Sequence, residues 1–463
     1  MLLVKRSDTM RFMPGHYVFP GGRVDKADAH LPLAGAASQE DARFIVAAVR
    51  ECFEEAGVLL TEGPPLDAEA LESARRRLLA GDQDFLAILD AFGHHIDGAR
   101  FRPIGLWVTP PLSPIRFFTR FYLFQADEFY EATALPEEGE IVAVDWVMPA
   151  RARREWHVNS RHLSAPVAYV LHHLAAMELE DAVPWLNAVP ADDDGVATCF
   201  EFRRGIHLMP LESPTIPPAT HTNTLLLGEE EMVVIDPGAA TEEENQRLLD
   251  RLRHFEALGG RLVAIILTHS HIDHVAGTVW LRGQQDVPVW AHSETAAQLD
   301  FPVDRHLSDG ERIVLSGDPG WELECLHTPG HDPGHLALLE HRTGTLMAGD
   351  LLANPGTIVI SPDWRGDMSA YLDSLTRCAE LPFGLLIPGH GAPLFGRTGQ
   401  EAITQLIAHR LERETRIQQA LDSGINTMGA LLEHAYGDVS QESWPLAEHQ
   451  ARAHLLRLGV ELE

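Results

Sequence analysis

The stretch that decides the fold is THSHIDH, Thr268–His274, which directly follows the apolar segment Leu262–Leu267. A short apolar run that ends in polar residues predicts a buried strand with a loop at its carboxyl end. Ligand sites of α/β proteins form at that edge of the sheet. The side chains gathered there are His269, His271, Asp273 and His274. Imidazole nitrogens and carboxylate oxygens suit Zn²⁺ or a similar divalent ion.

Three later segments also place chemically active residues beside apolar strands or in turns. HTPGHDPGH (327–335) contains His331 and His335, MAGD (347–350) contains Asp350 at a predicted strand end, and PGHG (388–391) contains His390. A predicted strand pair, LLLG and MVVIDPG, precedes them and ends beside Asp236. Together these segments predict an α/β domain over residues 221–396.

The order and spacing of these residues resemble the metallo-β-lactamase superfamily, in its β-lactamase-like protein 2 and glyoxalase-II-like branch. That family has the pattern HxHxDH, then a His, an Asp and a His. The resemblance implies an αβ/βα sandwich with two Zn²⁺ ions. It implies that one ion is held by His269, His271 and His331, the other by Asp273, His274 and His390, and that Asp350 bridges them. Two such ions activate a shared water, which Asp273 is placed to orient as a catalytic residue.

Two neighbours of these ligands carry weaker expectations. His335 is expected to support a ligand rather than to bind a metal itself. Asp332 follows His331, where related sequences usually have Ser or Thr, and is expected to be an exposed turn residue.

The N-terminal part has its own motif, RECFEEAGV at residues 50–58, within a predicted helix over Ala42–Val58. Helical spacing puts Glu51, Glu54 and Glu55 on one face. Three adjacent carboxylates repel one another, so a bound Mg²⁺ or Mn²⁺ explains them, and a solvated acidic face is the alternative.

With the upstream PGHYVFPGG, this motif resembles the second half of the Nudix box, REUxEExGU. The resemblance implies a Nudix-like α/β/α sandwich over residues 1–180, with Glu51, Glu54 and Glu55 as metal ligands and Glu54 and Glu55 in catalysis. Gly22 stands 14 residues further from Glu51 than in the standard box, and Ala42 replaces the Glu eight positions before Arg50. Long insertions of this kind occur in the Nudix subgroup that includes coenzyme A diphosphatases. The opening LLVKRS normally follows an earlier strand, so this domain is expected to lack its first strand.

Composition indicates how many domains the chain has, which binding partners it disfavours and in which cellular compartment it is expected. The 463 residues predict roughly three domains. The net charge of −32 argues against non-specific binding to long nucleic acids or anionic membranes. The four cysteines form no CxxC pair, and no apolar run is long enough to span a membrane. We therefore expect a cytoplasmic protein without a membrane anchor.

Two further segments complete the division of the chain. Residues 181–220 contain the acidic run Asp192–Asp194 and the stretch PLESPTIPPAT, and are predicted as a linker. Residues 397–463 predict three helices, at 399–422, 427–436 and 444–458. This tail resembles the small winged-helix tail of the β-lactamase-like protein 2 group, which includes a single-strand endoribonuclease, and a helical packing module is the alternative. The tail has many acidic residues and no Lys, which weakens a role in nucleic-acid binding.

These observations predict a fusion of a Nudix-like domain, a metallo-β-lactamase-fold hydrolase domain and a winged-helix-like tail. The dinuclear, zinc-containing centre is expected to hydrolyse a small thioester or ester. The Nudix-like domain is expected to hydrolyse or bind a nucleoside diphosphate derivative such as coenzyme A. Two alternatives stay open. One is a single-strand endoribonuclease, and the other is a hydrolase regulated by a non-catalytic, nucleotide-binding Nudix module.

Overall fold

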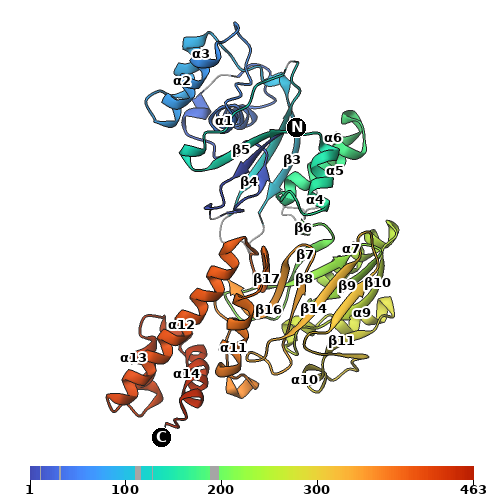
Figure 1. Cartoon of the computed structure of the whole chain (residues 1–463), viewed down its shortest axis with the longest axis vertical. Coiled ribbons are helices and arrows are strands. Elements are labelled where there is room, and N and C mark those ends of the chain that lie inside the picture. Colours follow the sequence, from blue (N-terminus) through green and yellow to red (C-terminus); the bar gives the residue numbers. More distant parts are fainter. Residues whose placement is uncertain (11, 31–32, 110–115, 128, 188–197, 463) are drawn as a thin grey trace. The chain divides into compact units, whose positions relative to one another are not determined.

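The computed structural model describes residues 1–10, 12–30, 33–109, 116–127, 129–187 and 198–462 (Figure 1). They form two compact units. Unit 1 holds the described residues up to Thr198 together with Phe202–Arg204, and unit 2 holds Cys199–Glu201 and the residues from Gly205 onward.

Unit 1 combines two small antiparallel sheets with helices. One sheet has the order β2-β1-β5, formed by Tyr17–Val18, Leu2–Arg6 and Ile141–Trp146, and the other pairs β3 (Phe101–Val108) with β4 (Phe118–Phe124). The α-helices are α1 (Gln39–Ala56), α2 (Ala68–Leu79), α3 (Phe85–Phe92), α4 (Pro149–His157), α5 (Ala165–Ala176) and α6 (Leu179–Asn187). Short 3-10 helices are η1 (Ala27–His30), η2 (Gly98–Arg100) and η3 (Pro136–Glu138).

Helices cover both faces of the sheet that contains β1. Successive side chains of a strand point to opposite faces. Leu3 belongs to the same apolar cluster as Trp156 of α4 and Leu171 of α5, whereas the next residue, Val4, packs with Cys52 of α1. This arrangement confirms the predicted α/β/α layering of the N-terminal part.

The helix that carries the three glutamates has clear ends. The Ser38 hydroxyl accepts the N–H of Asp41 at its start, and Gly57 closes its other end with a φ of 70°, a conformation that favours glycine. Ile45 and Phe53 lie in a buried cluster with residues of α3. Burial of this apolar side leaves the glutamates on the rest of the helix surface.

Unit 2 contains two larger sheets. The first has the order β12-β11-β10-β9-β8-β7-β6, formed by Arg305–Leu307, Val289–His292, Arg261–Ile266, Glu231–Ile235, His221–Gly228, Ile206–Glu212 and Phe200–Arg203. The second runs β13 to β18 in chain order, formed by Arg312–Leu315, Trp321–His327, Leu336–Glu340, Thr345–Asn354, Leu385–Gly391 and Leu394–Phe395. Strands β9 to β12 are parallel, as are β16 and β17.

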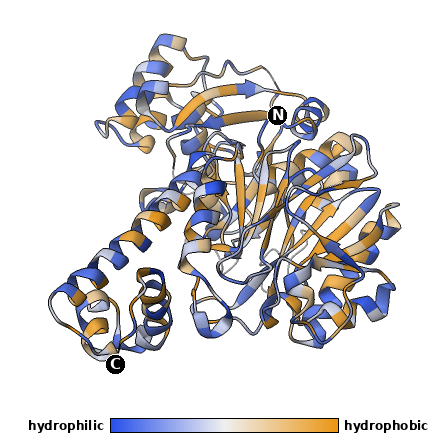
Figure 2. Cartoon of the chain, turned by 60° about the horizontal axis from the view of Figure 1, so that its bottom comes forward, coloured by the Kyte–Doolittle hydropathy of each residue, from blue (hydrophilic) through white to orange (hydrophobic). Residues whose placement is uncertain are grey.

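Unit 2 also contains helices. They are α7 (Glu242–Ala257), α8 (Ile272–Val275), α9 (Thr278–Gln285), α10 (Ser293–Ala296), η4 (Pro362–Trp364) and α11 (Met368–Ala379). Of these, α7, α9 and α11 pack against the sheets. Leu248 of α7 and Leu281 of α9 share a cluster with Val234 of β9, and Leu375 of α11 shares one with Leu346 of β16. Strand β8 contacts β17 across the sheets, and Figure 2 shows that most of the strands are hydrophobic. The predicted αβ/βα sandwich is confirmed.

The predicted linker is wrong over part of its length. Strands β6 and β7 fall inside residues 181–220, and six of the seven residues of β7 are buried. Their place in the seven-stranded sheet outweighs the proline signal, whose first residue, Pro210, lies within β7 and pairs with Asn223 of β8. The acidic run Asp192–Asp194 lies outside the described residues.

The C-terminal tail is helical, as predicted. Its helices are α12 (Arg397–Asp422), α13 (Met428–Tyr436) and α14 (Trp444–Leu458), with a 3-10 helix η5 (Gln441–Ser443). No strand occurs in residues 397–462, so this described stretch lacks the hairpin that would form a wing.

None of the described helices has both the length and the apolar composition that crossing a membrane requires.

Candidate metal centre

Four candidate ligands follow strand β10. This strand ends at Ile266, and the chain leaves the sheet before α8 begins at Ile272. His269 and His274 are completely buried, one before α8 and the other within it. The short loop and the single helical turn therefore fold the THSHIDH segment into a compact cluster.

The other three candidates come from the second sheet. His331 lies between β14 and β15, Asp350 lies within β16, and His390 lies in β17. The prediction that Asp350 ends a strand is wrong, because β16 continues to Asn354. The pairing of β16 with β17 shifts register on both sides of Gly349. An irregular ladder re-aims side chains, and here Asp350 lies among the histidines although it belongs to a strand.

Asp350 is the common neighbour of the histidines. One of its oxygens, Oδ2, lies 3.3 Å from Nε2 of His331 and 3.9 Å from Nε2 of His269. Its other oxygen, Oδ1, lies 3.3 Å from Nε2 of both His274 and His390. The carboxylate therefore faces two pairs of imidazoles, one pair on each oxygen.

Within the described residues, three groups bring their ligand atoms within 4.8 Å of one another. They are His269, His271 and His331; His269, His274 and Asp350; and Asp273, His274 and His390. The seven predicted ligands of this domain are thus brought together from segments more than a hundred residues apart.

The outer nitrogen of several rings is held by a polar partner. Nδ1 of His331 contacts the carbonyl of Val359 at 2.9 Å, and Nδ1 of His390 contacts the carbonyl of His221 at 2.9 Å. Nδ1 of His274 contacts the carboxylate of Asp236 at 2.8 Å. Such contacts fix the ring and direct its Nε2 toward a metal.

The inner atoms have the properties of an ion site. Nε2 of His331 and Oδ1 of Asp350 are buried without a hydrogen-bond partner in the described residues. Burying polar atoms unpaired costs free energy. A divalent cation among these nitrogens and oxygens would satisfy them, so the residues present fit the metal that the donor set implies.

The charges of the cluster lead to the same conclusion. Burial disfavours the charged form of His390, but the carboxylates of Asp350 and Asp273 raise its pKa to about 10. Burial also opposes ionisation of Asp273, yet His274 and His390 lower its pKa. Protonated imidazoles thus balance the carboxylates of the bare protein. A metal ion would supply the same positive charge and displace these protons.

The three glutamates of α1 are arranged differently. Nη1 of Arg50 lies 3.0 Å from Glu51 and 3.1 Å from Glu54, and Oε2 of Glu55 accepts the N–H of Gly21 at 2.9 Å. In the described residues, the carboxylate oxygens of these glutamates do not form a group within 4.8 Å of one another. The ligand atoms of the histidine cluster do. Arg50 occupies the space between two of them.

The insertion before Arg50 hides one residue that the sequence reasoning missed. Asp28 is buried and pairs with Arg50 through two contacts of 3.1 Å. It stands six residues after Gly22, the distance at which the standard box has its Glu. The insertion therefore follows this acid, and counting forward from Gly22 would have found it. A Cβ on Gly22 would lie 2.3 Å from the Glu51 carboxylate, so a larger residue here would displace that carboxylate.

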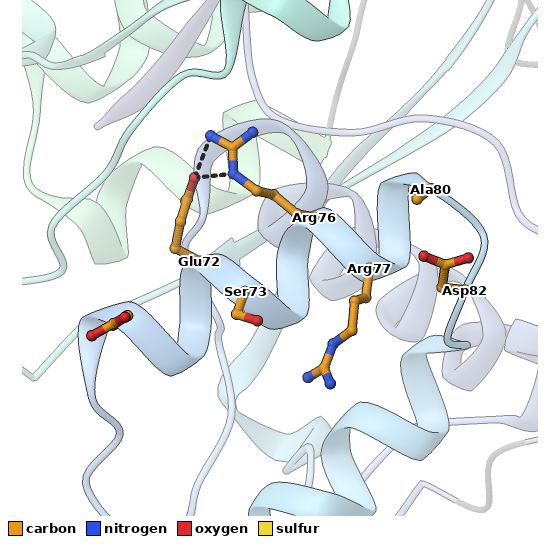
Figure 3. A pocket seen from close by; sticks show the side chains of 7 residues that line it. Glu72, Ser73, Arg76, Arg77, Ala80 and Asp82 are labelled. Carbon is orange, nitrogen blue, oxygen red and sulfur yellow. Dashed lines mark hydrogen bonds and ion pairs between the residues drawn. The ribbon is translucent and has the colours of Figure 1, made fainter.

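Two hollows occur on the α2 side of unit 1. The one in Figure 3 is lined by Glu72, Arg76 and Asp82 among others, and its Arg76 is paired with Glu72. It contains none of the predicted site residues. A second cavity, of about 280 Å³, is lined by Arg50 and Glu54 and by the turn between α2 and α3. This second cavity opens beside the carboxylates of α1.

Comparison with known proteins identifies both parts of the chain. Residues 217–390 match the metallo-beta-lactamase superfamily, and residues 32–174 match the NUDT19 Nudix domain. The chain is 32% identical over 195 residues to hydroxyacylglutathione hydrolase GloC of Haemophilus influenzae, with 37% of this chain and 85% of that protein covered. The chain belongs to the metallo-beta-lactamase superfamily.

The chain is also similar to two other relatives. The beta-lactamase-like protein 2 homolog of Drosophila melanogaster is 28% identical over 252 residues, which span 52% of this chain and 82% of that protein. Putative nudix hydrolase 7 of Caenorhabditis elegans is 31% identical over 178 residues, 38% of this chain and 56% of that protein. Both predicted resemblances are confirmed, and the chain is a metallo-beta-lactamase-fold hydrolase that carries a Nudix domain.

Two buried residues, His335 and Asp332, contact the candidate ligands or the loops that carry them. Nδ1 of His335 contacts the hydroxyl of Thr328 at 2.8 Å, and its Nε2 accepts the backbone N–H of Asp350 at 3.0 Å. Burial lowers the pKa of His335 to about 3, which keeps the ring neutral and able to accept. This geometry agrees with the supporting role expected for His335.

The expectation that Asp332 is an exposed turn residue is wrong. It is fully buried, accepts the Ser270 hydroxyl at 2.6 Å and the Gln298 amide at 3.2 Å, and accepts the N–H of Gly334 at 2.7 Å. Ser270 lies between two candidate ligands. Asp332 therefore ties the THSHIDH loop of the metallo-beta-lactamase domain to the loop of His331.

Replacing Asp332 with alanine should lower the free energy of unfolding by about 1–3 kcal/mol, because buried donors lose their acceptor. Chemical denaturation of the metal-free chain measures this effect. Asp363→Ala is the matched control, since the side chain of Asp363 is 63% exposed, and its effect should stay within about 0.5 kcal/mol. Equal effects of the two substitutions would contradict the bridging role of Asp332.

The Nudix domain should lose stability as pH rises when no metal is present. Burial raises the pKa of Glu55 from 4.5 to about 8 and that of Glu51 to about 7. The folded state therefore binds these protons more tightly than the unfolded state, and stability falls between about pH 4.5 and pH 8. Mg²⁺ at these glutamates would require the ionised carboxylates, so its stabilising effect should grow over the same range.

Thermal melts with and without Mg²⁺, at about pH 6 and about pH 9, measure both effects. Glu55→Gln should reduce the pH dependence, whereas the exposed Glu72→Gln should leave it unchanged. A melting temperature of unit 1 that is insensitive to pH in the wild type would show that these carboxylates titrate normally.

Proposed function

We propose that the metallo-beta-lactamase domain hydrolyses a small acyl thioester or ester at a dinuclear zinc centre. The observation that carries this proposal is the position of Asp350, within 3.9 Å of four buried imidazoles. One zinc ion would be held by His269, His271 and His331, the other by Asp273, His274 and His390, with Asp350 between them.

Bound zinc ions would lower the pKa of a shared water and stabilise negative charge on the attacked oxygen. The protein's own residues prepare this chemistry. In the metal-free chain, His274 and His390 lower the pKa of the Asp273 carboxyl. Bound zinc would supply the same positive charge, so the ionised carboxylate could orient the water and accept a proton. Asp236 holds the ring of His274 and also accepts the N–H and the hydroxyl of Thr268, at 2.7 and 2.6 Å.

The substrate class is supported by relatives and by charge. The relative from Haemophilus influenzae is named a hydroxyacylglutathione hydrolase, and hydroxyacylglutathione is a thioester. The chain's net charge of −32 disfavours a long polyanion such as RNA. A small thioester meets neither this repulsion nor a need for an extended basic groove.

Metal analysis followed by a substrate panel tests this proposal. The purified chain, after reconstitution with Zn²⁺, should hold two ions and cleave thioesters faster than single-stranded RNA at physiological salt. Fewer than one ion per chain would contradict the dinuclear centre. Rapid RNA cleavage together with slow thioester cleavage would favour the endoribonuclease alternative.

We propose a second, Mg²⁺- or Mn²⁺-dependent activity for the Nudix domain, on a nucleoside diphosphate derivative such as coenzyme A. It is supported by the cavity beside Glu54 and by the Asp28–Arg50 pair that anchors α1. Glu54→Gln should abolish diphosphate hydrolysis and leave thioester hydrolysis intact, with Glu72→Gln as control. Binding of coenzyme A without turnover in the wild type would favour the regulatory alternative.

A further inference from the structure

The tail helices belong to the core of the unit that carries the metal centre. Ile403 and Leu406 of α12 and Ala453 of α14 are buried in one cluster with Leu346 and Ala348 of β16. Asp350 follows in the same strand two residues after Ala348. The tail is therefore packed against the structure that presents the ligands.

Arg410 of α12 is a charged residue buried at this interface between the tail and the sheet. It is 2% exposed and forms no ion pair with a carboxylate in the described residues. Its guanidinium donates to the hydroxyl of Thr357 at 2.6 Å, to the carbonyl of Ile358 at 2.5 Å and to the side chain of Gln450 in α14. Burying a cation without an acid costs several kcal/mol, so apolar packing alone does not explain an arginine here.

The residues that Arg410 contacts lead directly to a candidate ligand. Thr357–Ser361 has no regular secondary structure. We call it the 357–361 segment. In its middle, the carbonyl of Val359 contacts Nδ1 of His331 at 2.9 Å. No strand ladder fixes this segment. Its Ile358 and Ile360 pack in the core cluster, and the Ser361 carbonyl accepts two backbone N–H groups. Side chains of the tail supply further contacts that set the position of the Val359 carbonyl.

Both ends of the 357–361 segment are held by the tail. Arg410 contacts its first two residues, and at its last residue the Ser361 hydroxyl contacts Nδ1 of His449 in α14 at 2.8 Å. Nη2 of the guanidinium holds both acceptors of the segment while Nη1 holds Gln450, and the ammonium of a lysine lacks this planar fork. The tail thus contacts the carbonyl of Ile358 on one side of Val359 and the hydroxyl of Ser361 on the other, and the carbonyl between them orients His331.

We propose that the C-terminal helices position one half of the metal centre, and that Arg410 is the positioning residue that sets the ring of His331 through the 357–361 segment. This inference rests on the metal centre proposed above. It assigns the tail a role in metal binding that does not require nucleic acid.

Zinc affinity of the full-length chain tests the inference. Apoprotein is titrated with Zn²⁺ against a chromophoric chelator, and folding is followed by circular dichroism. In Arg410→Met, one of the two zinc ions should bind about 10–100-fold more weakly, the effect of losing an outer partner of a ligand. The other ion, held by Asp273, His274 and His390, should keep its wild-type affinity.

Arg413→Met is the matched control, because this buried arginine lies three residues further along α12. It donates to the carbonyl of Ala435 and to Asp438, both outside the 357–361 segment. Arg413→Met should lower the melting temperature and leave both zinc affinities unchanged. Arg410→Lys keeps the positive charge but lacks the forked guanidinium. The zinc affinity of its weaker site should therefore lie between the affinities of the wild type and of Arg410→Met.

Each possible result of these zinc titrations either supports or overturns the role of Arg410. Wild-type zinc affinities in a folded Arg410→Met would overturn the inference. If Arg410→Met does not fold, Arg410→Lys decides in the same way. Equal weakening by Arg413→Met would also overturn it, since general loosening of the tail would then be the cause. Wild-type protein that binds fewer than two zinc ions would instead refute the proposed centre itself.

Discussion

An Asp350→Asn variant is expected to lose at least one of its two zinc ions and to hydrolyse thioesters roughly a thousandfold more slowly. The neutral amide gives up the charge shared between the two pairs of imidazoles. Loss of metal assistance removes several kcal/mol of transition-state stabilisation, and about 4 kcal/mol corresponds to that change in rate.

Elemental analysis and kcat/KM, measured on the same preparation, check this expectation. Asp373→Asn on the exposed side of α11 is the matched control and should retain both metal and activity. Full zinc content with normal kcat/KM in Asp350→Asn would show that this carboxylate does not belong to the centre.

An Asp273→Asn variant should lose about two to four orders of magnitude in kcat and remain folded, because the amide cannot accept a proton from the water. Asp273 is only partly buried and lies 3.4 Å from Nε2 of His390. Replacing this carboxylate should therefore affect the reaction more than the packing of the core.

The measurement is kcat at saturating Zn²⁺, beside a thermal melt. Saturating zinc separates a lost proton acceptor from a weakened ligand, because only the second defect is repaired by more metal. Activity near that of the wild type would mean that Asp273 has been given the wrong role.

Much of this architecture could be predicted because the hydrophobic pattern and the functional residues lie in the same short segments of sequence. The apolar run before THSHIDH becomes β10, and the three helices predicted for the tail become α12, α13 and α14. The glutamates of α1 lie on one helix with a serine cap and a glycine end. In each case, the residues that decide the structure lie within a few turns or one strand of one another.

What could not be predicted depends on contacts between distant residues. Asp332 is buried because it meets Ser270, which stands 62 residues earlier. Asp28 meets Arg50 across an insertion. Residues 200–212 are flanked by acidic and proline-containing stretches that are typical of a linker. They nevertheless join a sheet whose other strands come later in the chain. Composition within a window contains none of this information, since burial is decided by the partner that arrives from elsewhere.

The long separation between the ligands also sets the order in which a growing chain can acquire its metals. His269, His271, Asp273 and His274 are synthesised close together, but His390 emerges 116 residues after His274, and Arg410 comes later still. A nascent chain therefore cannot complete the site of Asp273, His274 and His390 before β17 is made. We expect metal uptake to be one of the last events of biosynthesis, after the second sheet has closed on the first. Cells starved of zinc during translation, and resupplied afterwards, should then recover active protein from molecules that are already complete.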